Sequence, residues 1–228
     1  MKKKVAIFID WDNFRQELDA VTKITKTDVN TFNYNYTPAL MGAIKNFLSY
    51  SEDEELYRIF IYTAPPLSQA HIEKELSKRK TDKKLIDKVK IYYAQNKERI
   101  DTTYTKAKKF IDNIALEDYV ALRKGILKVN KVCENGEVTI NQKQVDMLIG
   151  LDIAQLSYEN RVDKIIVLSK DTDMKPAIKV ARVNGLHTII GCFEEYPAGI
   201  PRELKEHADT IRKKSFKEFI KEYSLNKK

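Results

Sequence analysis

Short apolar runs alternate along the chain with segments whose apolar residues recur at helical spacing. The runs predict strands at about 5–9, 56–62, 89–94, 164–168 and 187–192. The chain holds only 7 Gly and 6 Pro, too few turn-forming residues for a typical all-β protein. Strands separated by helical segments are joined by crossovers and lie mainly parallel in one sheet. The pattern therefore predicts an α/β fold with about five mainly parallel strands flanked by helices.

Four segments place apolar residues three and four positions apart, the spacing of one helix face. They are 38–50, 145–158, 174–184 and 213–228. In the last segment, Phe216, Phe219 and Tyr223 fall on one face, which predicts an amphipathic C-terminal helix docked on the core. A helix that binds a membrane or a partner protein is the alternative.

One segment breaks the alternation of strands and helices. Two apolar stretches, 126–132 and 137–140, flank Asn135 and Gly136, a pair typical of a two-residue β-hairpin turn. We therefore predict a β-hairpin near 126–141. It would lead directly into the helix at 145–158.

The chain is basic, with a formal net charge of +8 over 228 residues. Lysines and arginines crowd the stretch 78–90. A basic surface favours a polyanionic partner such as a nucleic acid, although a solvated face explains a charge run equally well. We predict one domain over 1–212, with a helical basic elaboration around 68–124, followed by the helix at 213–228.

The two cysteines, Cys133 and Cys192, lie far apart and form no Cys-x-x-Cys pair. A structural zinc site needs about four Cys or His ligands at suitable spacing, so we predict two reduced thiols, as in a cytoplasmic protein. No apolar run approaches the roughly 20 residues that span a bilayer, and the first apolar run ends at Asp10, unlike a signal peptide. We expect a cytoplasmic location and no membrane partner.

Aspartates stand where apolar runs end or a helix begins, at Asp10, Asp146, Asp171 and Asp173. Each alone has a structural explanation, because aspartate caps helices and is favoured in their first turn. As a set they are expected to meet, since the carboxyl ends of parallel strands form ligand sites. Two carboxylates about 5 Å apart repel by roughly 3 kcal/mol at an effective dielectric near 20. A divalent cation relieves this repulsion, and oxygen ligands suit Mg²⁺ or Mn²⁺.

Three motifs contain these aspartates. They are FIDWDNF at 8–14, KQVD at 143–146 followed by Leu148 and Asp152, and LSKDTDMKP at 168–176. In sequence and order they resemble the motifs of NYN domains, the PIN-like nuclease family that includes LabA-like proteins. The resemblance covers roughly 3–193, and 68–124 matches it poorly.

The resemblance implies a PIN-like, Rossmann-like three-layer sandwich and metal-dependent cleavage of RNA, either single-stranded or structured. By this resemblance, the catalytic residues that hold one or two Mg²⁺ or Mn²⁺ ions would be Asp10, Asp146, Asp171 and Asp173. Such enzymes need no histidine base, and the chain has only 3 histidines.

Other residues of the motifs would act around these acids. Asn13 would bind the substrate or orient the first aspartate, and Ser169 would contact a phosphate or position its loop. Lys143 is predicted to contact a phosphate. Asp152 lies six residues after Asp146, about 120° away around an ideal helix. It is predicted either to support the metal ligands or to have a structural role.

The third motif departs from the family pattern. Two glycines are replaced by Lys170 and Thr172, and a phenylalanine by Met174. Loss of glycine narrows the conformations open to the loop. Lys170 contacts a substrate phosphate in one interpretation and marks altered activity in another, and Thr172 would lie beside the substrate or the ligands.

Three hypotheses follow. The first is a metal-dependent endoribonuclease. The second is a catalytically weak or inactive PIN-like module that binds RNA or a partner protein. The third is a haloacid-dehalogenase-like phosphatase, because Asp10-x-Asp12 after a strand also resembles the first motif of that family. A homodimer that extends the basic surface is a further hypothesis.

Overall fold

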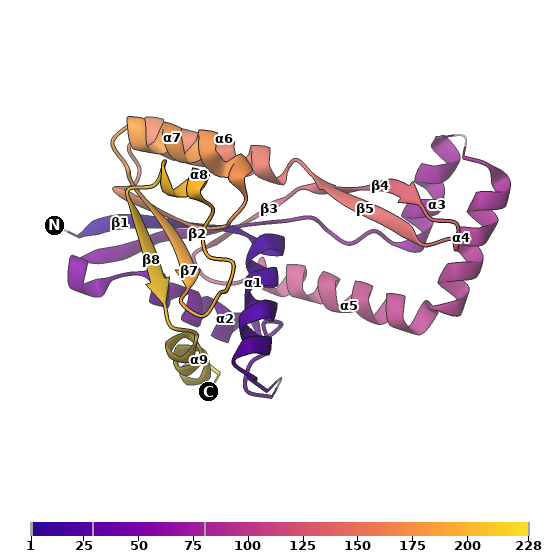
Figure 1. Cartoon of the computed structure of the whole chain (residues 1–228), viewed down its shortest axis with the longest axis horizontal. Coiled ribbons are helices and arrows are strands. Elements are labelled where there is room, and N and C mark those ends of the chain that lie inside the picture. The colour runs from indigo at the N-terminus through magenta and orange to yellow at the C-terminus, as the bar shows by residue number, and fades with distance from the viewer. Residues whose placement is uncertain (1, 29, 80, 228) are drawn as a thin grey trace.

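The centre of the computed structural model is a six-stranded sheet in which all neighbouring strands run parallel (Figure 1). The structure describes residues 2–28, 30–79 and 81–227. The strand order is β3-β2-β1-β6-β7-β8. The bounds are β1 Lys3–Asp10, β2 Glu54–Thr63, β3 Val120–Lys124, β6 Lys164–Leu168, β7 His187–Phe193 and β8 Thr210–Lys214. The predicted α/β fold, with mainly parallel strands flanked by helices, is confirmed.

Helices cover both faces of the sheet, because its central strands are apolar on both sides (Figure 1). Alternate residues of a strand point to opposite faces. Val5, Ile7 and Ile9 therefore lie in one core cluster and Ala6 and Phe8 in the other. The first face is covered by α1 (Trp11–Ile24), α2 (Thr37–Ile44), η1 (Lys45–Phe47) and α9 (Phe216–Leu225). The second is covered by α6 (Val145–Tyr158), α7 (Lys175–Val183) and α8 (Arg202–Lys205).

The segments with helical spacing form helices close to their predicted bounds. The segment 38–50 forms α2 and η1, followed by the short η2 (Tyr50–Glu52), and 174–184 forms α7. In α9, Phe219 and Tyr223 are buried in the core, and the Tyr223 hydroxyl donates a hydrogen bond of 2.9 Å to the Asn33 carbonyl. Within the described ranges, no helix combines the length and apolar composition needed to cross a membrane.

The two strands at the edges of the sheet, β3 and β8, were not predicted. The sequence of β3, VALRK, ends in two basic residues and that of β8, TIRKK, in three. An edge strand has one open side, where charged residues prevent pairing with other chains. Such strands lack the apolar run that identifies a buried strand.

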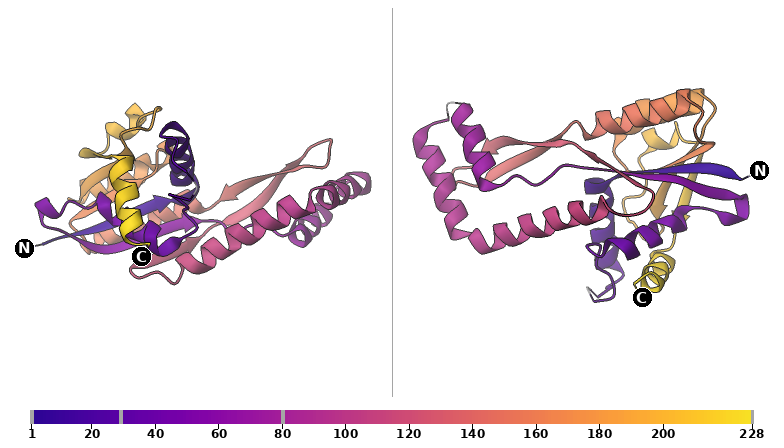
Figure 2. Two further views of the ribbon diagram at one scale, coloured as in Figure 1. Left: turned by 90° about the horizontal axis from the view of Figure 1, so that it is seen from below. Right: turned by 180° about the vertical axis from the view of Figure 1, so that it is seen from behind.

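The remaining elements form an extension that we call the arm (Figures 1 and 2). The arm consists of α3 (Gln69–Lys78), α4 (Lys83–Gln95), α5 (Lys97–Ile114) and a ribbon of the antiparallel strands β4 (Ile126–Val132) and β5 (Val138–Lys143). The ribbon confirms the predicted hairpin. In the views of Figures 1 and 2, α5 and the ribbon run side by side from the sheet to α3 and α4.

The strand predicted at 89–94 is wrong, because these residues lie within α4. The run, VKIYYA, is mainly apolar and aromatic, as a strand is, but Val89 and Tyr93 are also four residues apart, on one helix face. Both are buried in a small cluster with Val129 of the ribbon. Asp82 caps the helix by accepting a hydrogen bond of 2.9 Å from the Lys84 amide. Packing against the ribbon therefore outweighs the local strand preference.

Candidate metal centre

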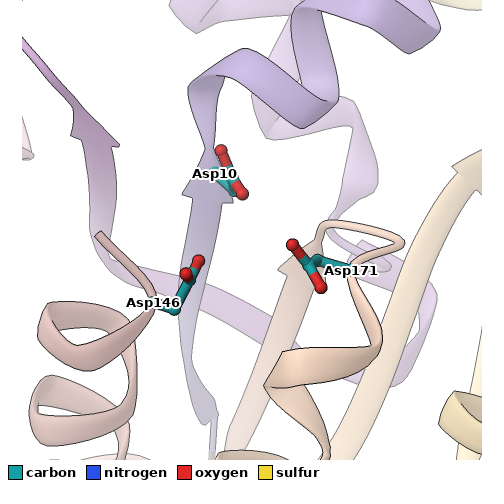
Figure 3. Close-up of side chains that lie close together, drawn as sticks. All are labelled: Asp10, Asp146 and Asp171. Atoms are coloured by element: carbon teal, nitrogen blue, oxygen red, sulfur yellow. The ribbon is translucent and has the colours of Figure 1, made fainter. Parts of the chain in front are cut away.

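Three aspartates from distant parts of the sequence meet at the carboxyl edge of the sheet. Asp10 is the last residue of β1, Asp171 follows β6, and Asp146 is in the first turn of α6. β1 and β6 are neighbours in the sheet, so the first two acids lie side by side. Each residue offers a carboxylate oxygen, and these three oxygens lie within 4.8 Å of one another (Figure 3). We call these residues the acidic cluster.

Two members of the acidic cluster also cap helices. The Asn13 amide donates to Asp10 Oδ1 at 3.3 Å at the start of α1. The Asp173 amide donates to Asp171 Oδ1 at 2.9 Å at the start of η3 (Thr172–Met174). A carboxylate has two oxygens and about four lone-pair sites, so a cap leaves capacity for a cation. Capping and metal binding are compatible here.

The third member is positioned by a left-handed residue. Gln144, between β5 and α6, has a φ of 74°. It turns the chain so that Val145 is buried and Asp146 is exposed in the first turn of α6. An acid is electrostatically favoured at this end of a helix. The ribbon therefore ends where it delivers a carboxylate to the cluster.

The acidic cluster has a repulsive electrostatic environment. Asp10 is 5% exposed, and its pKa is raised from 3.8 to about 6, mainly because the carboxyl is buried. The negative charges of Asp12, Asp146 and Asp171 raise this pKa further, whereas the hydrogen bond from the Asn13 backbone amide lowers it. Burial, followed by the charges of Asp171 and Asp173, raises the pKa of Asp146. Among residues 2–28, 30–79 and 81–227, the four predicted ligands form no salt bridge. The cluster thus lacks a cationic partner in the described part of the chain.

Two polar side chains hold the loop after β6 in place, one from α1 and one from the loop itself. The Lys170 amide donates to Asn13 Oδ1 at 2.9 Å. The Asp171 amide donates to Ser169 Oγ at 3.1 Å, and Ser169 is 1% exposed. Asn13 therefore forms hydrogen bonds both with Asp10 at the end of β1 and with the loop after β6 that carries Asp171. The roles of Asn13 and Ser169 at the site stay predictions.

Lys170 directs its charge into the protein. Its ammonium forms a salt bridge with Glu17 of α1 and lies 4.4 Å from the centroid of the Tyr196 ring. The Lys170 side chain is 8% exposed and that of Glu17 2%. Glu17 Oε1 also accepts a hydrogen bond of 2.8 Å from the Phe193 amide. The lysine that replaces a family glycine is therefore engaged by a buried acid.

A family model described as NYN domain matches residues 4–214. The chain belongs to the NYN domain family. The family is one of PIN-like nucleases, and the matched range includes the arm of this NYN domain. A search among curated proteins found no match. Among solved structures, a protein of unknown function from Vibrio parahaemolyticus aligns over 93% of each chain at 15% identity with a TM-score of 0.45. A likeness this distant carries no argument.

Several predicted site residues of this NYN domain lie outside the close group. Asp173 and Thr172 belong to η3, and Asp173 is exposed. Lys143 is the exposed last residue of β5. Asp152 accepts hydrogen bonds of 2.8 Å from the Tyr62 hydroxyl and from Arg123 Nε. It links α6 to β2 and β3, so the contacts favour its structural role.

Glu17 is a buried residue of this NYN domain that the sequence analysis missed. It sits between Phe14, Leu18 and Val21 on the buried face of α1. An acid on an otherwise apolar helix face is a signal that a buried cation faces it, since buried charges are paired. Its partner, Lys170, is also unusual for its position in the family motif. The two anomalies together could have predicted the pair.

Proposed function

We propose that this protein is a metal-dependent endoribonuclease that hydrolyses phosphodiester bonds of RNA. The observation that carries the proposal is the convergence of Asp10, Asp146 and Asp171 without a cationic partner among the described residues, in a member of a nuclease family. Asp173 contributes a further negative charge next to Asp146. Four carboxylates in one region favour a divalent cation and disfavour an anionic substrate without one.

The acidic cluster fits Mg²⁺ or Mn²⁺. Carboxylate oxygens are the ligands that these hard cations prefer. Two oxygens on one Mg²⁺ ion lie at most about 4.2 Å apart, given bond lengths near 2.1 Å. The three oxygens here lie within 4.8 Å of one another, so a small side-chain rotation brings them into range. The ligands of this site would be Asp10, Asp146 and Asp171, with Asp173 available for a second ion or an outer contact.

The proposed ligands differ in burial, and we assign them different roles on that basis. When bound, a divalent ion supplies an activated water for in-line attack on phosphorus and stabilises charge on the leaving oxygen. Asp10 is buried and accepts a hydrogen bond from the Asn13 backbone amide, so its carboxylate would be the most rigidly held ligand of the ion. Asp146 is exposed and lies on the side from which a phosphate can approach. Ser169 and Asn13 keep Asp171 in place through the loop after β6.

RNA is the proposed partner because the charge of the protein is concentrated in the arm. Residues 69–114 and 126–143 hold 16 lysines and arginines against 9 acids, which is +7 of the total of +8. Basic surfaces attract polyanions. A cytoplasmic location is proposed with it and fits the free thiols of Cys133 and Cys192. A homodimer that joins two basic surfaces remains a hypothesis.

The test is cleavage of labelled RNA by the parent protein and by Asp171→Asn, with Mg²⁺ or Mn²⁺ supplied or removed by chelation. Asparagine caps a helix as well as aspartate does, so the variant keeps its fold. Loss of about 3 kcal/mol of transition-state stabilisation should slow cleavage by roughly a hundredfold. The control is Asp118→Asn, an exposed acid just before β3, at the opposite end of the sheet. Full cleavage by Asp171→Asn would refute the assignment.

The second candidate is a module that binds RNA or a partner protein and cleaves slowly or not at all. The replacement of two glycines by Lys170 and Thr172, together with the basic arm, favours it. Binding that weakens steeply with salt, without metal-dependent cleavage, would select it. The phosphatase alternative fits less well. It needs Asp12 beside Asp10, but Asp12 lies in α1, where its carboxylate is 3.8 Å from Arg15 Nε.

A further inference from the structure

Two adjoining hollows run along α5 from the neighbourhood of the acidic cluster into the arm. The first has a volume of about 370 Å³ and is lined by Trp11, Asp12 and Thr63, at the ends of β1 and β2. The second, of about 360 Å³, lies between α5, α4 and the ribbon. They adjoin each other, because both are lined by Pro66, Thr103, Ala107 and Leu127. We call the two adjoining hollows together the arm groove.

The arm groove combines flat apolar surfaces with cations. Its aromatic lining includes the half-buried rings of Tyr34, Tyr92 and Tyr104. Exposed Arg99 and Lys106 supply positive charge along α5. Neither forms a salt bridge with any residue that the structure describes. Their charges are thus available to a ligand.

Arg99 already positions one of these rings. Its Nη2 donates a hydrogen bond of 3.1 Å to the Tyr92 hydroxyl. By contrast, Arg15 at the other end of the groove lies 3.2 Å from Asp19 and 3.8 Å from Asp12, so its charge is largely compensated. Glu137 of the ribbon turn is the other acid of the lining, so the groove wall keeps a net positive charge only through Arg99 and Lys106 of α5.

We propose that the arm groove binds a single-stranded polynucleotide and leads it to the acidic cluster. This inference rests on the proposed function and names the substrate form and the surface that selects it. Aromatic rings alternate with cations where single strands are held, because bases stack on the rings while phosphates contact the cations. The arm supplies the charge, +7 of +8, and the groove supplies the rings.

The dimensions favour a single strand over a duplex. Each hollow has the size of a small-ligand site, which accommodates a base or two. In a double helix the bases face each other and are not available to the tyrosines. The lining of α5 extends from Arg99 to Ile111, about 18 Å at 1.5 Å per residue. That length matches about five nucleotides at the 3.4 Å spacing of a stacked strand.

The first experiment measures binding without cleavage. Fluorescent twelve-residue oligouridine, oligodeoxyuridine and a duplex of equal length are titrated with the full chain in EDTA at several salt concentrations. We expect either single strand to bind at least tenfold more tightly than the duplex, and the tighter of the two identifies the preferred sugar. Equal or tighter binding of the duplex overturns the inference, as does failure of both single strands to bind.

Matched variants locate the site. Arg99→Gln/Lys106→Gln removes two positive charges from the groove, and Lys217→Gln/Lys221→Gln removes two from exposed positions of α9. The groove variant should bind oligouridine at least tenfold more weakly, with a salt slope lower by about 1.4, since each phosphate contact contributes about 0.7. Tyr104→Leu should weaken binding about tenfold without changing the slope. Equal losses in groove and α9 variants would contradict a defined track.

Cleavage separates this inference from the proposed function. If the groove guides substrate to an intact acidic cluster, Arg99→Gln/Lys106→Gln lowers kcat/KM at least tenfold and leaves kcat nearly unchanged. Groove-dependent binding without any cleavage supports the inference and rejects the nuclease. Metal-dependent cleavage that the groove variant performs with parental kcat/KM rejects the inference and keeps the nuclease.

Discussion

The side-chain oxygen of Asn13 accepts a hydrogen bond of 2.9 Å from the backbone amide of Lys170. The bond joins the first turn of α1 to the loop after β6. Both bonded residues lie next to an acid of the cluster, because the Asn13 amide donates a hydrogen bond to Asp10 and Lys170 directly precedes Asp171. The separation of the two carboxylates therefore depends on a residue that carries no charge.

We expect Asn13→Ala to weaken metal binding. Outer contacts of metal ligands typically contribute 10–100-fold to metal affinity, so Mn²⁺ should bind roughly tenfold or more weakly. Calorimetric titration of the folded protein with Mn²⁺ measures this. Asn130→Ala, at an exposed position of β4, is the control and should bind Mn²⁺ as the parent does. An unchanged affinity in Asn13→Ala would show that the two segments hold their spacing without this bond.

The buried carboxyl of Asp10 gives the metal-free protein a specific pH dependence. Its pKa rises from 3.8 to about 6 on folding, so the native state binds this proton more tightly than the unfolded chain does. The contribution of Asp10 to stability is therefore fully present below about pH 4 and is lost as the pH rises through about 6. At 1.36 kcal/mol per pKa unit, the full loss is about 3 kcal/mol.

Asp10→Asn removes this titration and keeps the helix cap. In EDTA, its free energy of unfolding should exceed that of the parent by about 2–3 kcal/mol at pH 7.5, and the difference should shrink toward pH 4. Urea unfolding at both pH values tests it, with Asp118→Asn as the exposed control. A parent protein that is the more stable of the two at pH 7.5 would mean that Asp10 has a cationic partner.

The sequence predicted the parts of this fold that depend on apolar periodicity. β1, β6 and β7 are apolar runs buried on both faces, and α6 has helical spacing over its whole length. The edge strands β3 and β8 were missed because their faces are only partly buried, so they carry few apolar residues. The segment 89–94 was misassigned, because the ribbon that buries one face of α4 lies more than 30 residues later in the sequence.

The candidate site was also predictable only in part. The positions of Asp10, Asp146 and Asp171 at the ends of predicted elements were enough to predict their convergence. The direction of a charged side chain is not encoded in spacing, however. Lys170 was expected either to contact a substrate phosphate or to mark altered activity, and its contact with Glu17 follows only from the packing of α1 against the loop after β6. Likewise, Asp152 bonds to Arg123 of an edge strand that was not predicted.

The Glu17–Lys170 pair should be strongly coupled. Because both side chains are more than nine-tenths buried, Glu17→Gln leaves a buried ammonium without its partner and should destabilise the fold by about 3–5 kcal/mol. Glu17→Gln/Lys170→Met should recover most of this loss. Urea unfolding of the parent, both single variants and the double variant gives the coupling energy. Glu206→Gln, in the exposed pair with Arg202, should cost less than about 1 kcal/mol.

The same double variant tests the interpretation in which Lys170 contacts a substrate phosphate. If the Lys170 ammonium interacts only with Glu17, the variant Glu17→Gln/Lys170→Met binds RNA with the affinity and the salt slope of the parent protein. A slope reduced by about 0.7 would show that Lys170 contacts one phosphate, and the interpretation based on the buried pair would be wrong.

The turn of the ribbon is predicted to depend on Gly136 for two reasons. Its φ of +88° is unfavourable for other residues, and a Cβ atom there would lie 2.3 Å from the Lys88 carbonyl oxygen of α4. Gly185 has nearly the same φ, +87°, with no atom within 4 Å of such a Cβ. Gly185→Ala should therefore cost about 1 kcal/mol, from the backbone conformation alone. Gly136→Ala should cost clearly more, because the ribbon must also move away from α4.

Hydrogen exchange should locate the extra loss of stability in α4 and the ribbon. Equal costs for the two substitutions would mean that the ribbon and α4 separate without loss of stability, and that the far end of the arm is not held as the packing of Val89 and Tyr93 implies.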